Sequence, residues 1–414
     1  MENLETLEKG KLLIEWASKE MPVLKILREN FLQNKPFAGV KIGACLHITS
    51  ETANLVLLLK DAGAKVFLTA SNPLSTNNDI VEYLKNYEGI HVDSKRGEST
   101  QEYYQNIKKV VENQPDLIID DGGDLISTIC TESKTLASKV IGACEETTTG
   151  VIRINNLFKD GKLYFPVIAV NNAKTKHMFD NRYGTGQSTI DGILRATNIL
   201  LASKTCVVAG YGWCGKGVAQ KLRAMGSKVI ITEIDPIKAL EAVMDGFEVK
   251  TMEEASTLGD VFITVTGNTK VIAEKHFKIM KDGAILANSG HFNVEVDVEY
   301  LEKNKVAKRK VRENLEEYIM PNGKHLYLVA EGRLANLVAA EGHPAAVMDM
   351  SFANQALCLE FFIKNKTKLK PGTYEVPMEI DKKVAFYKLL SMKIRIDELT
   401  EEQEKYLKSW NLGT

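Results

Sequence analysis

The sequence predicts an α/β fold built from two doubly wound parallel sheets. Short apolar runs alternate with helical patterns almost from the first residue, as expected where helices cover both faces of a parallel sheet. A glycine-rich turn at 210–215 lies near the middle of the chain and opens a second series of this kind. With 414 residues, of which 44% are hydrophobic, the chain is long enough to form two or three separate cores.

The first sheet is predicted from five apolar runs. A helical pattern over 52–59, closing near Gly63, follows the first of them. The predicted strands are 39–46, 64–69, 116–120, 140–143 and 166–170.

The second sheet is predicted after a long helical pattern over 191–203. Beyond this sheet, 348–363 is expected to be a mainly buried helix, and the last third of the chain is expected to be helical and charged. The strands of the second sheet are predicted to begin at Thr205, Lys228, Phe247, Val261 and Ala284.

Charge and composition exclude several classes of partner. Lys and Arg total 53 against 54 Asp and Glu, which leaves a formal charge of −1, so we expect neither a nucleic acid nor a membrane surface as partner. No apolar run approaches the roughly 20 residues of a bilayer span, and the first residues lack the pattern of a signal peptide. The six cysteines form no C-x-x-C pair and no metal-ligand spacing, so we expect reduced thiols, a cytoplasmic protein and no metal site.

The turn at 210–215 has the pattern G-x-G-x-x-G between an apolar strand and a helix. Gly210 permits the tight bend, Gly212 lets the backbone approach a pyrophosphate, and Gly215 lets the helix pack on the strand. Glu233 ends the next strand, 23 residues after Gly210, where a carboxylate binds the ribose hydroxyls of NAD and repels the extra phosphate of NADP. We therefore expect NAD as the cofactor; the alternative is a glycine-rich turn in another kind of α/β protein.

Polar clusters follow the predicted strands at the end where a doubly wound sheet presents its ligand site. A single cluster is more often a helix cap with solvated charges, but five in one chain are hard to explain as caps alone. The clusters lie at 46–51, 120–124, 145–150, 171–181 and 288–292.

These clusters and the glycine turn belong to a series of motifs. The motifs are Cys-Leu-His-x-Thr-x-Glu-Thr-Ala at 45–53, Asp-Asp-Gly-Gly-Asp at 120–124, Glu-Glu-Thr-Thr-Thr-Gly-Val at 145–151, Phe-Asp-Asn-x-Tyr-Gly at 179–184, Val-Val-Ala-Gly-Tyr-Gly at 207–212, Ile-Thr-Glu-Ile-Asp-Pro at 231–236, Gly-His-Phe at 290–292, Ala-Glu-Gly-Arg-Leu at 330–334 and Gly-His-Pro at 342–344. In this order and at these spacings, the chain resembles the S-adenosyl-L-homocysteine hydrolase family over nearly its whole length.

The resemblance explains why a hydrolase would carry a dinucleotide fold. A thioether at the ribose 5′ carbon is a poor leaving group. In the family, bound NAD oxidises the 3′-hydroxyl, which acidifies the 4′ C–H so that homocysteine leaves by elimination. Water then adds and the ketone is reduced again, so NAD is regenerated in every turnover. The implied activity is reversible hydrolysis of S-adenosyl-L-homocysteine to adenosine and L-homocysteine.

The resemblance implies four catalytic residues around the 3′-hydroxyl. Lys176 would be the base, and a lysine works as a base near neutral pH only if its pKa is lowered. Glu146 would hold the 3′-hydroxyl, while Asp180 and Asn181 would orient Lys176 and the ribose.

Three further catalytic residues are implied near the leaving group. His47 and Asp121 would manage the 4′ proton and the water or leaving thiolate, in a division of roles that the sequence leaves open. His291 would lie on the homocysteine side.

Thr49 and Glu51 match the family's contacts to the adenine ring.

The resemblance also implies contacts where the cleft closes and where NAD binds. His343 would contact adenine through its backbone and ring. The implied NAD contacts are Thr147, Thr148, Thr149, Asn181, Gly210, Gly212, Gly215, Glu233, Thr266 and Asn336.

The implied organisation is a substrate-binding domain at 1–184, an NAD-binding Rossmann domain at 185–342, a return to the substrate domain at 343–385 and a short helical tail at 386–414. We expect a homo-oligomer, a tetramer or a dimer, with subunit contacts through the helix at 348–363 and the cofactor domain.

Three features depart from the family pattern. Thr185 stands where many members have a cysteine, so any thiol role at this position is absent. Trp213 and Cys214 stand where many members have Asp-Val in the phosphate turn, which is expected to alter either the affinity for NAD or the preference between its oxidised and reduced forms. The residues 408–414 replace a Lys-x-x-x-Tyr element that in many members reaches a neighbouring subunit's cofactor site, so sealing of NAD between subunits is not expected here.

Three other functions remain open. The first is hydrolysis of S-inosyl-L-homocysteine by the same mechanism; Thr49 and Glu51 argue against it, because Glu51 can accept a hydrogen bond from the adenine amine that hypoxanthine lacks. The second is a two-domain NAD dehydrogenase with net redox change, which leaves Lys176 and Glu146 unexplained. The third is a non-catalytic NAD sensor, which should have lost residues of the reacting centre that this chain retains.

Overall fold

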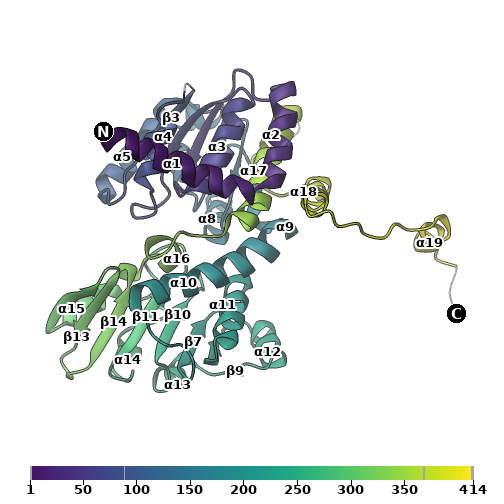
Figure 1. Ribbon diagram of the computed structural model, residues 1–414. Coiled ribbons are helices and arrows are strands. Elements are labelled where there is room, and N and C mark those ends of the chain that lie inside the picture. The colour runs from purple at the N-terminus through teal and green to yellow at the C-terminus, as the bar shows by residue number, and fades with distance from the viewer. Residues whose placement is uncertain (1, 88, 367–368, 412–414) are drawn as a thin grey trace.

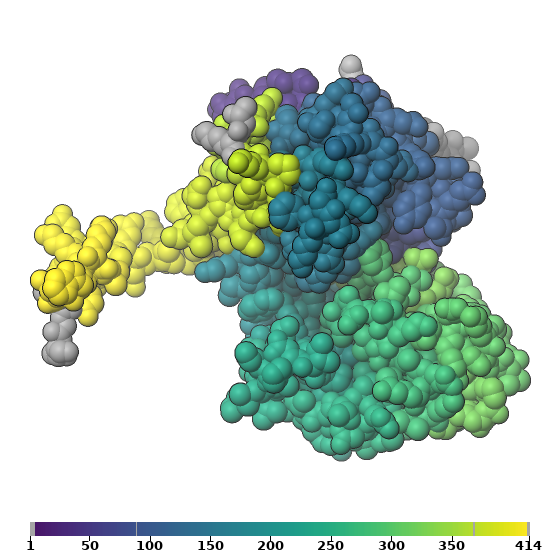
Figure 2. Space-filling view, turned by 180° about the vertical axis from the view of Figure 1, so that it is seen from behind, coloured from purple at the N-terminus to yellow at the C-terminus, as the bar shows by residue number. Residues whose placement is uncertain are grey.

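The computed structural model describes residues 2–87, 89–366 and 369–411. Two lobes, each built on one sheet, lie one above the other in Figure 1, and Figure 2 shows the same division from behind. The first sheet is parallel throughout and the second is mostly parallel, with helices on both faces of each. The predicted fold class, two doubly wound α/β units, is confirmed.

The first sheet belongs to the unit formed by the N-terminal half of the chain and by a late return. Each neighbouring pair of its strands is parallel. In spatial order, its strands in the described residues are β15 (Gly372–Glu375), β6 (Pro166–Ala169), β5 (Gly142–Glu145), β4 (Leu117–Asp120), β1 (Lys41–Cys45), β2 (Lys65–Thr69) and β3 (Ile90–Val92).

Two hydrophobic clusters cover the two faces of the first sheet. One packs α1–α4 with the late helices α17 (Ala345–Lys364) and α18 (Met378–Ser391), and the other packs α5–α8. The earlier helices are α1 (Glu2–Lys19), α2 (Pro22–Asn34), α3 (Ser50–Asp61), α4 (Asn78–Leu84), α5 (Thr100–Glu112), α6 (Asp124–Glu132), α7 (Lys134–Ala137) and α8 (Thr148–Lys159).

The second sheet carries the glycine-rich turn. Its strands, in spatial order, are β12 (Ala307–Arg312), β13 (Leu315–Ile319), β14 (His325–Val329), β11 (Ala284–Asn288), β10 (Val261–Thr264), β7 (Thr205–Ala209), β8 (Lys228–Thr232) and β9 (Glu248–Val249). Its helices are α11 (Trp213–Ala224), α12 (Pro236–Met244), α13 (Met252–Ser256), α14 (Glu274–Phe277) and α15 (Val298–Asn304).

The prediction that the last third of the chain is helical is wrong for two segments. β12 and β13 form an antiparallel ribbon that pairs with β14, and β15 joins the first sheet beside β6. β12 is exposed and charged, so it lacks the apolar alternation that marks a half-buried strand. Two other strands differ in extent from the prediction. The strand predicted at 140–143 is β5, which begins at Gly142 and runs to Glu145, and the strand predicted from Phe247 is only two residues long.

The chain crosses between the two units twice. The first crossing is α9 (Lys174–Lys176), the π-helix η2 (His177–Gly184) and α10 (Thr185–Thr197). The helix predicted over 191–203 therefore starts earlier and stops sooner, because Asn198 adopts a left-handed conformation that caps its end. The second crossing runs through η3 (Ala330–Gly332) and α16 (Ala335–Val338) to the segment 342–344.

Helix α17 is longer than the helix predicted at 348–363. With 20 residues and a mean hydropathy of 1.2, it is long and apolar enough to cross a membrane by length and composition, contrary to our expectation of no such run. However, 67% of this stretch is buried inside the protein, where the helix packs against α2, α3 and β5. The burial indicates a core helix of the first unit.

After α18 the chain leaves the body of the protein. The last helix, α19 (Glu401–Leu407), is exposed along its whole length and projects away from both lobes (Figures 1 and 2). The tail nevertheless carries large apolar side chains, including Ile396 and Trp410, which are 69% and 95% exposed. Exposed apolar side chains gathered on one segment are typical of a surface that contacts a partner.

Candidate active site

The register of the first sheet brings its polar strand ends to one edge. Cys45 lies opposite Asp120, and Asp120 lies opposite Glu145 on the next strand. The residues that follow, His47, Asp121 and Glu146, therefore emerge side by side at the carboxyl edge of β1, β4 and β5. β1 is also the point where the strand order reverses, since its neighbours β2 and β4 lie on opposite sides.

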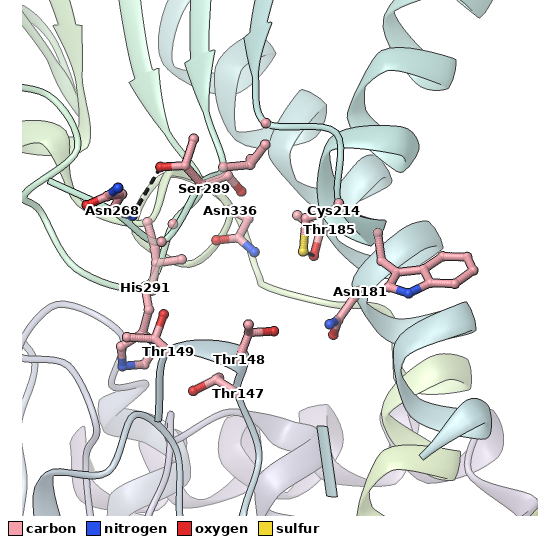
Figure 3. A pocket seen from close by; sticks show the side chains of 18 of the residues that line it. Thr147, Thr148, Thr149, Asn181, Thr185, Cys214, Asn268, Ser289, His291 and Asn336 are labelled. Atoms are coloured by element: carbon pink, nitrogen blue, oxygen red, sulfur yellow. Dashed lines mark hydrogen bonds between the residues drawn. The ribbon is translucent and has the colours of Figure 1, made fainter. Parts of the chain in front are cut away.

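The carboxyl edge of the second sheet faces this edge across a cavity of about 1160 Å³. Figure 3 shows the turn Thr147–Thr149 from the first unit opposite Ser289, His291 and Asn336 from the second. Every predicted site residue lines the cavity except Glu51 and Gly215. A cavity of this size between two α/β units is a typical site for a dinucleotide with its substrate.

Lys176 lines the cavity and is buried among polar partners. Its Nζ is 2.8 Å from Asp180 Oδ2, 2.6 Å from Asn181 Oδ1 and 3.7 Å from Glu146 Oε1. Asp180 and Asn181 reach the same amine because η2 is a π-helix: its wider turn places residues i+4 and i+5 on the face of Lys176. The wide turn is a local deviation that the residue pattern did not predict.

The protonation of Lys176 differs from our expectation. Burial, the largest effect, lowers its pKa, but the carboxylates of Asp180 and Glu146 together outweigh burial and hold the pKa of Lys176 above its ordinary value. The expected lowering of this pKa is therefore wrong for this arrangement. Lys176 is an ammonium group here, and its carboxylate partners hold the proton more firmly than in an exposed lysine.

Glu146 is held by two residues that the sequence analysis missed. Ser351 Oγ donates to its Oε1, and Gln355 Nε2 donates to its Oε2 at 2.5 Å. Burial raises the pKa of Glu146 to about 7, so its proton is exchangeable near neutral pH. The available signal was that Ser351 and Gln355 are polar residues four positions apart, on one face of the mainly apolar helix α17.

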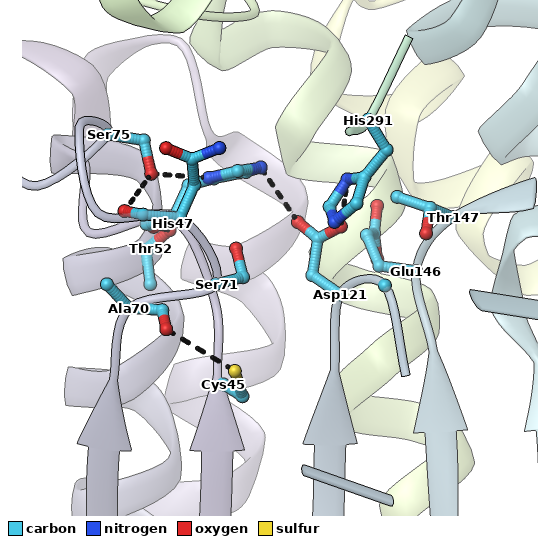
Figure 4. Close-up of polar contacts among 12 residues, drawn as sticks. Cys45, His47, Thr52, Ala70, Ser71, Ser75, Asp121, Glu146, Thr147 and His291 are labelled. Atoms are coloured by element: carbon cyan, nitrogen blue, oxygen red, sulfur yellow. Dashed lines mark hydrogen bonds and ion pairs between the residues drawn. The ribbon is translucent and has the colours of Figure 1, made fainter. Parts of the chain in front are cut away.

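His47, Asp121 and His291 meet across the two units, as Figure 4 shows. His47 Nε2 lies 3.6 Å from Asp121 Oδ2, and His291 Nδ1 lies 3.8 Å from Asp121 Oδ1. Burial lowers the pKa of His47 to about 3 and that of His291 to about 4, so both rings are neutral. Burial raises the pKa of Asp121. The three groups can exchange protons without large changes in charge.

Ser75, which the sequence analysis also missed, selects the tautomer of His47. Its hydroxyl donates to the carbonyl of Asn72 at 3.1 Å and lies 2.6 Å from His47 Nδ1 (Figure 4). Because its only hydrogen is used on Asn72, Ser75 accepts from Nδ1–H. His47 Nε2 is then the unprotonated nitrogen, and it faces Asp121.

The same trio could ligate a metal ion. One donor atom from each of His47, Asp121 and His291 lies within 4.8 Å of the other two. The sequence spacing gave no sign of such a set, because the three come from β1, β4 and β11 and meet only in the fold. The distances of 3.6 and 3.8 Å from the two histidines to Asp121 also suit acid–base groups whose hydrogen bonds shorten only when substrate binds.

The glycine-rich turn has the geometry of a pyrophosphate site. A Cβ on Gly215 would lie 1.9 Å from the carbonyl oxygen of Gly210, so this glycine serves packing and lies outside the cavity. A Cβ on Gly212 would meet nothing within 4 Å, which leaves room for a phosphate. Glu233 accepts from the Tyr211 N–H at 2.7 Å and so ties the turn to the end of β8.

The opposite end of the cofactor cleft offers free polar groups. Asn336 Oδ1 is buried and has no hydrogen-bond partner among the described residues, so it is available to a bound amide. Thr266 is fixed by Glu295, whose carboxylate accepts from its N–H at 2.9 Å and its Oγ1 at 2.6 Å. These groups and the turn Thr147–Thr149 fit a nicotinamide riboside, and they connect with the phosphate turn through one cavity.

Two threonines predicted as ligands also cap helices. Thr147 accepts from the Gly150 N–H at the start of α8, and Thr49 accepts from the Thr52 N–H at the start of α3. Both still line the cavity. Glu51 lies in the first turn of α3 beside Thr49, but it does not line the cavity. Burial raises the pKa of its carboxyl group.

Comparison with known proteins agrees with this geometry. A family model described as S-adenosyl-L-homocysteine hydrolase matches residues 1–137, and its NAD binding domain matches residues 181–342. An adenosylhomocysteinase from Aquifex aeolicus is 60% identical over 100% of this chain and 99% of its own length. The chain belongs to the S-adenosyl-L-homocysteine hydrolase family. It is therefore an enzyme with NAD as its cofactor.

Other relatives differ in the name of their substrate. An adenosylhomocysteinase from Saccharolobus solfataricus is 56% identical over 100% of this chain and 99% of its own length. An S-inosyl-L-homocysteine hydrolase from Methanopyrus kandleri is 54% identical over 98% of this chain and 96% of its own length. A dipicolinate synthase structure from Bacillus halodurans, with 15% identity, a TM-score of 0.50 and coverage of 79% of this chain and 99% of its own, shares the fold.

Proposed function

We infer that this chain catalyses the reversible hydrolysis of S-adenosyl-L-homocysteine to adenosine and L-homocysteine. One observation carries the inference: a buried lysine with two carboxylates and an amide lies across one cavity from a dinucleotide turn. A dehydrogenase with net redox change would need only one acid–base group beside the reacting alcohol. Here a second group, at His47 and Asp121, is available to break and form a bond at a neighbouring carbon.

We propose that the first group acts at the ribose 3′-oxygen. Bound NAD supplies the reversible oxidation of the 3′-hydroxyl. Glu146 accepts a hydrogen bond from a ribose hydroxyl, while Lys176 exchanges the 3′ proton. As an ammonium, Lys176 donates this proton in the final reduction; as an amine, it takes the proton in the initial oxidation. Asn181 fixes the amine in position by accepting from Nζ.

We propose that the second group acts at C4′ and C5′. His47 Nε2, left unprotonated by Ser75, accepts a proton, and Asp121 exchanges it with the leaving thiolate or the entering water. His291 reaches the same carboxylate from the second unit.

Adenosyl substrate is proposed over inosyl substrate on the basis of the first turn of α3. Thr49 lines the cavity, and Glu51 follows it with a carboxyl group whose pKa burial raises. A carboxylate that rotates toward the cavity can accept from the adenine amine but finds no donor at that position on hypoxanthine.

The test is to incubate the purified protein with S-adenosyl- and S-inosyl-L-homocysteine separately. We expect free thiol and adenosine from the first compound, about tenfold faster than thiol from the second, since leaving a buried acceptor unpaired costs about 1–3 kcal/mol and about 1.4 kcal/mol corresponds to a factor of ten. Protein-bound NAD should stay constant. Faster turnover of the inosyl compound would reverse the substrate assignment, and net accumulation of NADH would indicate a dehydrogenase.

We also propose a homo-oligomer, located in the cytoplasm. The six cysteines are all free thiols, as expected in a reducing compartment. Because α17 is mostly buried in its own unit, it offers little surface to a partner, and the projecting tail with Ile396, Leu399 and Trp410 is the better candidate contact.

Removing residues 393–414 should therefore lower the native mass toward that of a single chain. Light scattering after size exclusion measures the mass, and the variant Ile396→Ser/Leu399→Ser/Trp410→Ser keeps the length while removing the apolar contacts. An unchanged mass in both variants would show that the tail does not hold subunits together.

A further inference from the structure

The imidazole of His343 has both of its nitrogens engaged by the protein. Nδ1 lies in close hydrogen-bond contact with Asp180 Oδ1, and Nε2 lies 3.2 Å from Thr185 Oγ1. A ring that is satisfied on both sides has no free nitrogen for adenine. The adenine contact expected of His343 therefore stays a prediction for its backbone and for the face of its ring, which lines the cavity.

The direction of these hydrogen bonds follows from the acceptors. Asp180 is ionised, because His343 and Lys176 hold its pKa below the ordinary value against the opposing effect of burial. A carboxylate only accepts, so Nδ1 carries a hydrogen and donates. The other ring nitrogen, Nε2, lies against Thr185 Oγ1, which is also 3.5 Å from Cys214 Sγ.

The contacts form a chain across the molecule. It runs from Cys214 in the phosphate turn through Thr185 and His343 to Asp180, and Asp180 meets Lys176 at 2.8 Å. His343 lies on the second crossing between the units, whereas Asp180 and Thr185 lie on the first. His343 can make both contacts only when the two crossings are held at this separation.

Gly184 makes room for the contact between His343 and Asp180. A Cβ at this position would lie 3.0 Å from Asp180 Oδ1 and 3.0 Å from the ring carbon Cγ of His343. Its backbone is helical, so the requirement for glycine here is steric. The fold thus reserves space for this pair.

We propose that His343 is a positioning residue for Lys176: it holds Asp180 against the lysine amine and makes that contact depend on the relative position of the two units. The proposal rests on the proposed function and deepens it. Asp180 orients Lys176 best when one of its oxygens is fixed by His343, because the other oxygen is then aimed at Nζ. The remaining ionisable groups that interact with this pair are Glu146, Asp121 and His47 from the first unit and Cys214 from the second.

The test compares the wild type with His343→Ala and His343→Asn. An asparagine amide takes roughly the place of Nδ1, so it keeps the donor to Asp180 and loses the contact with Thr185. The rate of 3′-oxidation is measured by mixing the NAD-loaded protein with adenosine and following reduced nicotinamide. We expect His343→Ala to slow this step about 10²-fold with little change in adenosine affinity, as for a misplaced catalytic group. We expect His343→Asn to recover most of the rate.

The pH profile separates positioning from a merely structural role. The 3′-oxidation requires the amine form of Lys176, so its rate rises with pH until the amine predominates. A less firmly held Asp180 stabilises the ammonium form less, so the acid limb of His343→Ala should move to lower pH by about one unit, and that of His343→Asn should return toward wild type. An unmoved limb, or a loss confined to adenosine affinity, would overturn the proposal and favour a direct adenine contact.

A second measurement does not depend on turnover. Acylation of Lys176 by an amine reagent at fixed pH, followed by peptide mass spectrometry, reports the fraction of free amine. In His343→Ala the loosened Asp180 should lower the pKa of Lys176 and speed labelling severalfold, with the exposed Lys174 as an internal control. Equal labelling in both proteins would contradict the proposal. Failure of the wild type to hydrolyse S-adenosyl-L-homocysteine would contradict the proposed function instead and leave this result interpretable.

Discussion

Replacing Lys176 by methionine should lower kcat by about 10³-fold or more while the protein remains folded and loaded with NAD. A positioned acid–base group contributes about 10²- to 10⁴-fold to a rate, and the Nζ of Lys176 is held in the cavity wall by its three partners. Methionine matches the length of the buried stem. Asp180 keeps His343 as a partner, and Glu146, with its pKa raised to about 7 by burial, can take up a proton.

The matched control for this variant is Lys174→Met. Lys174 lies two residues earlier on the same short helix, but its side chain is exposed. Turnover, bound NAD and thermal unfolding should be measured for both variants. Near-normal turnover in Lys176→Met would remove this residue from the proposed mechanism, and an equal loss in Lys174→Met would point to disruption of the helix.

Replacing Gly212 by alanine should reduce bound NAD to below about a tenth of the wild-type content without destabilising the protein free of cofactor. The backbone of Gly212 has φ −71° and ψ −170°, which alanine adopts without strain, and its Cβ would meet nothing within 4 Å. The same Cβ would occupy the space through which a pyrophosphate approaches the helix N-terminus.

Gly215→Ala provides the contrast. Its Cβ would lie 1.9 Å from the carbonyl oxygen of Gly210, so the strand and helix must move apart. We expect this variant to unfold at a lower temperature than the wild type even without NAD. Gly212→Ala should instead lose only the increase in unfolding temperature that NAD binding confers. Wild-type NAD content in Gly212→Ala would show that the pyrophosphate lies elsewhere.

The fold class and most of the cavity wall could be predicted from the sequence because both follow from local patterns. Apolar runs mark parallel strands, and the carboxyl ends of such strands meet at one edge. Asp121 and Glu146 follow their strands directly, so their placement required only that the strands pair in register, as they do.

The remaining features depend on contacts that no local pattern encodes. The π-helix that brings both Asp180 and Asn181 to Lys176 differs from an α-helix only by a slight widening of the turn. The pKa of Lys176 is set by the arrangement of carboxylates from two elements. The hydrogen bonds of Ser351 and Gln355 to Glu146 span sequence separations of 205 and 209 positions. Likewise, His47, Asp121 and His291 lie close to one another only once the two units have packed together.

The late return of the chain to the first sheet has a consequence for the order in which the protein acquires its structure during synthesis. The second unit is continuous, so it can fold as soon as the ribosome has released it. The first unit lacks β15 and the core helix α17 until the last fifth of the chain emerges. The first unit therefore stays partly unfolded while the second unit, although synthesised later, is already folded. During this interval the nascent chain most needs protection from aggregation.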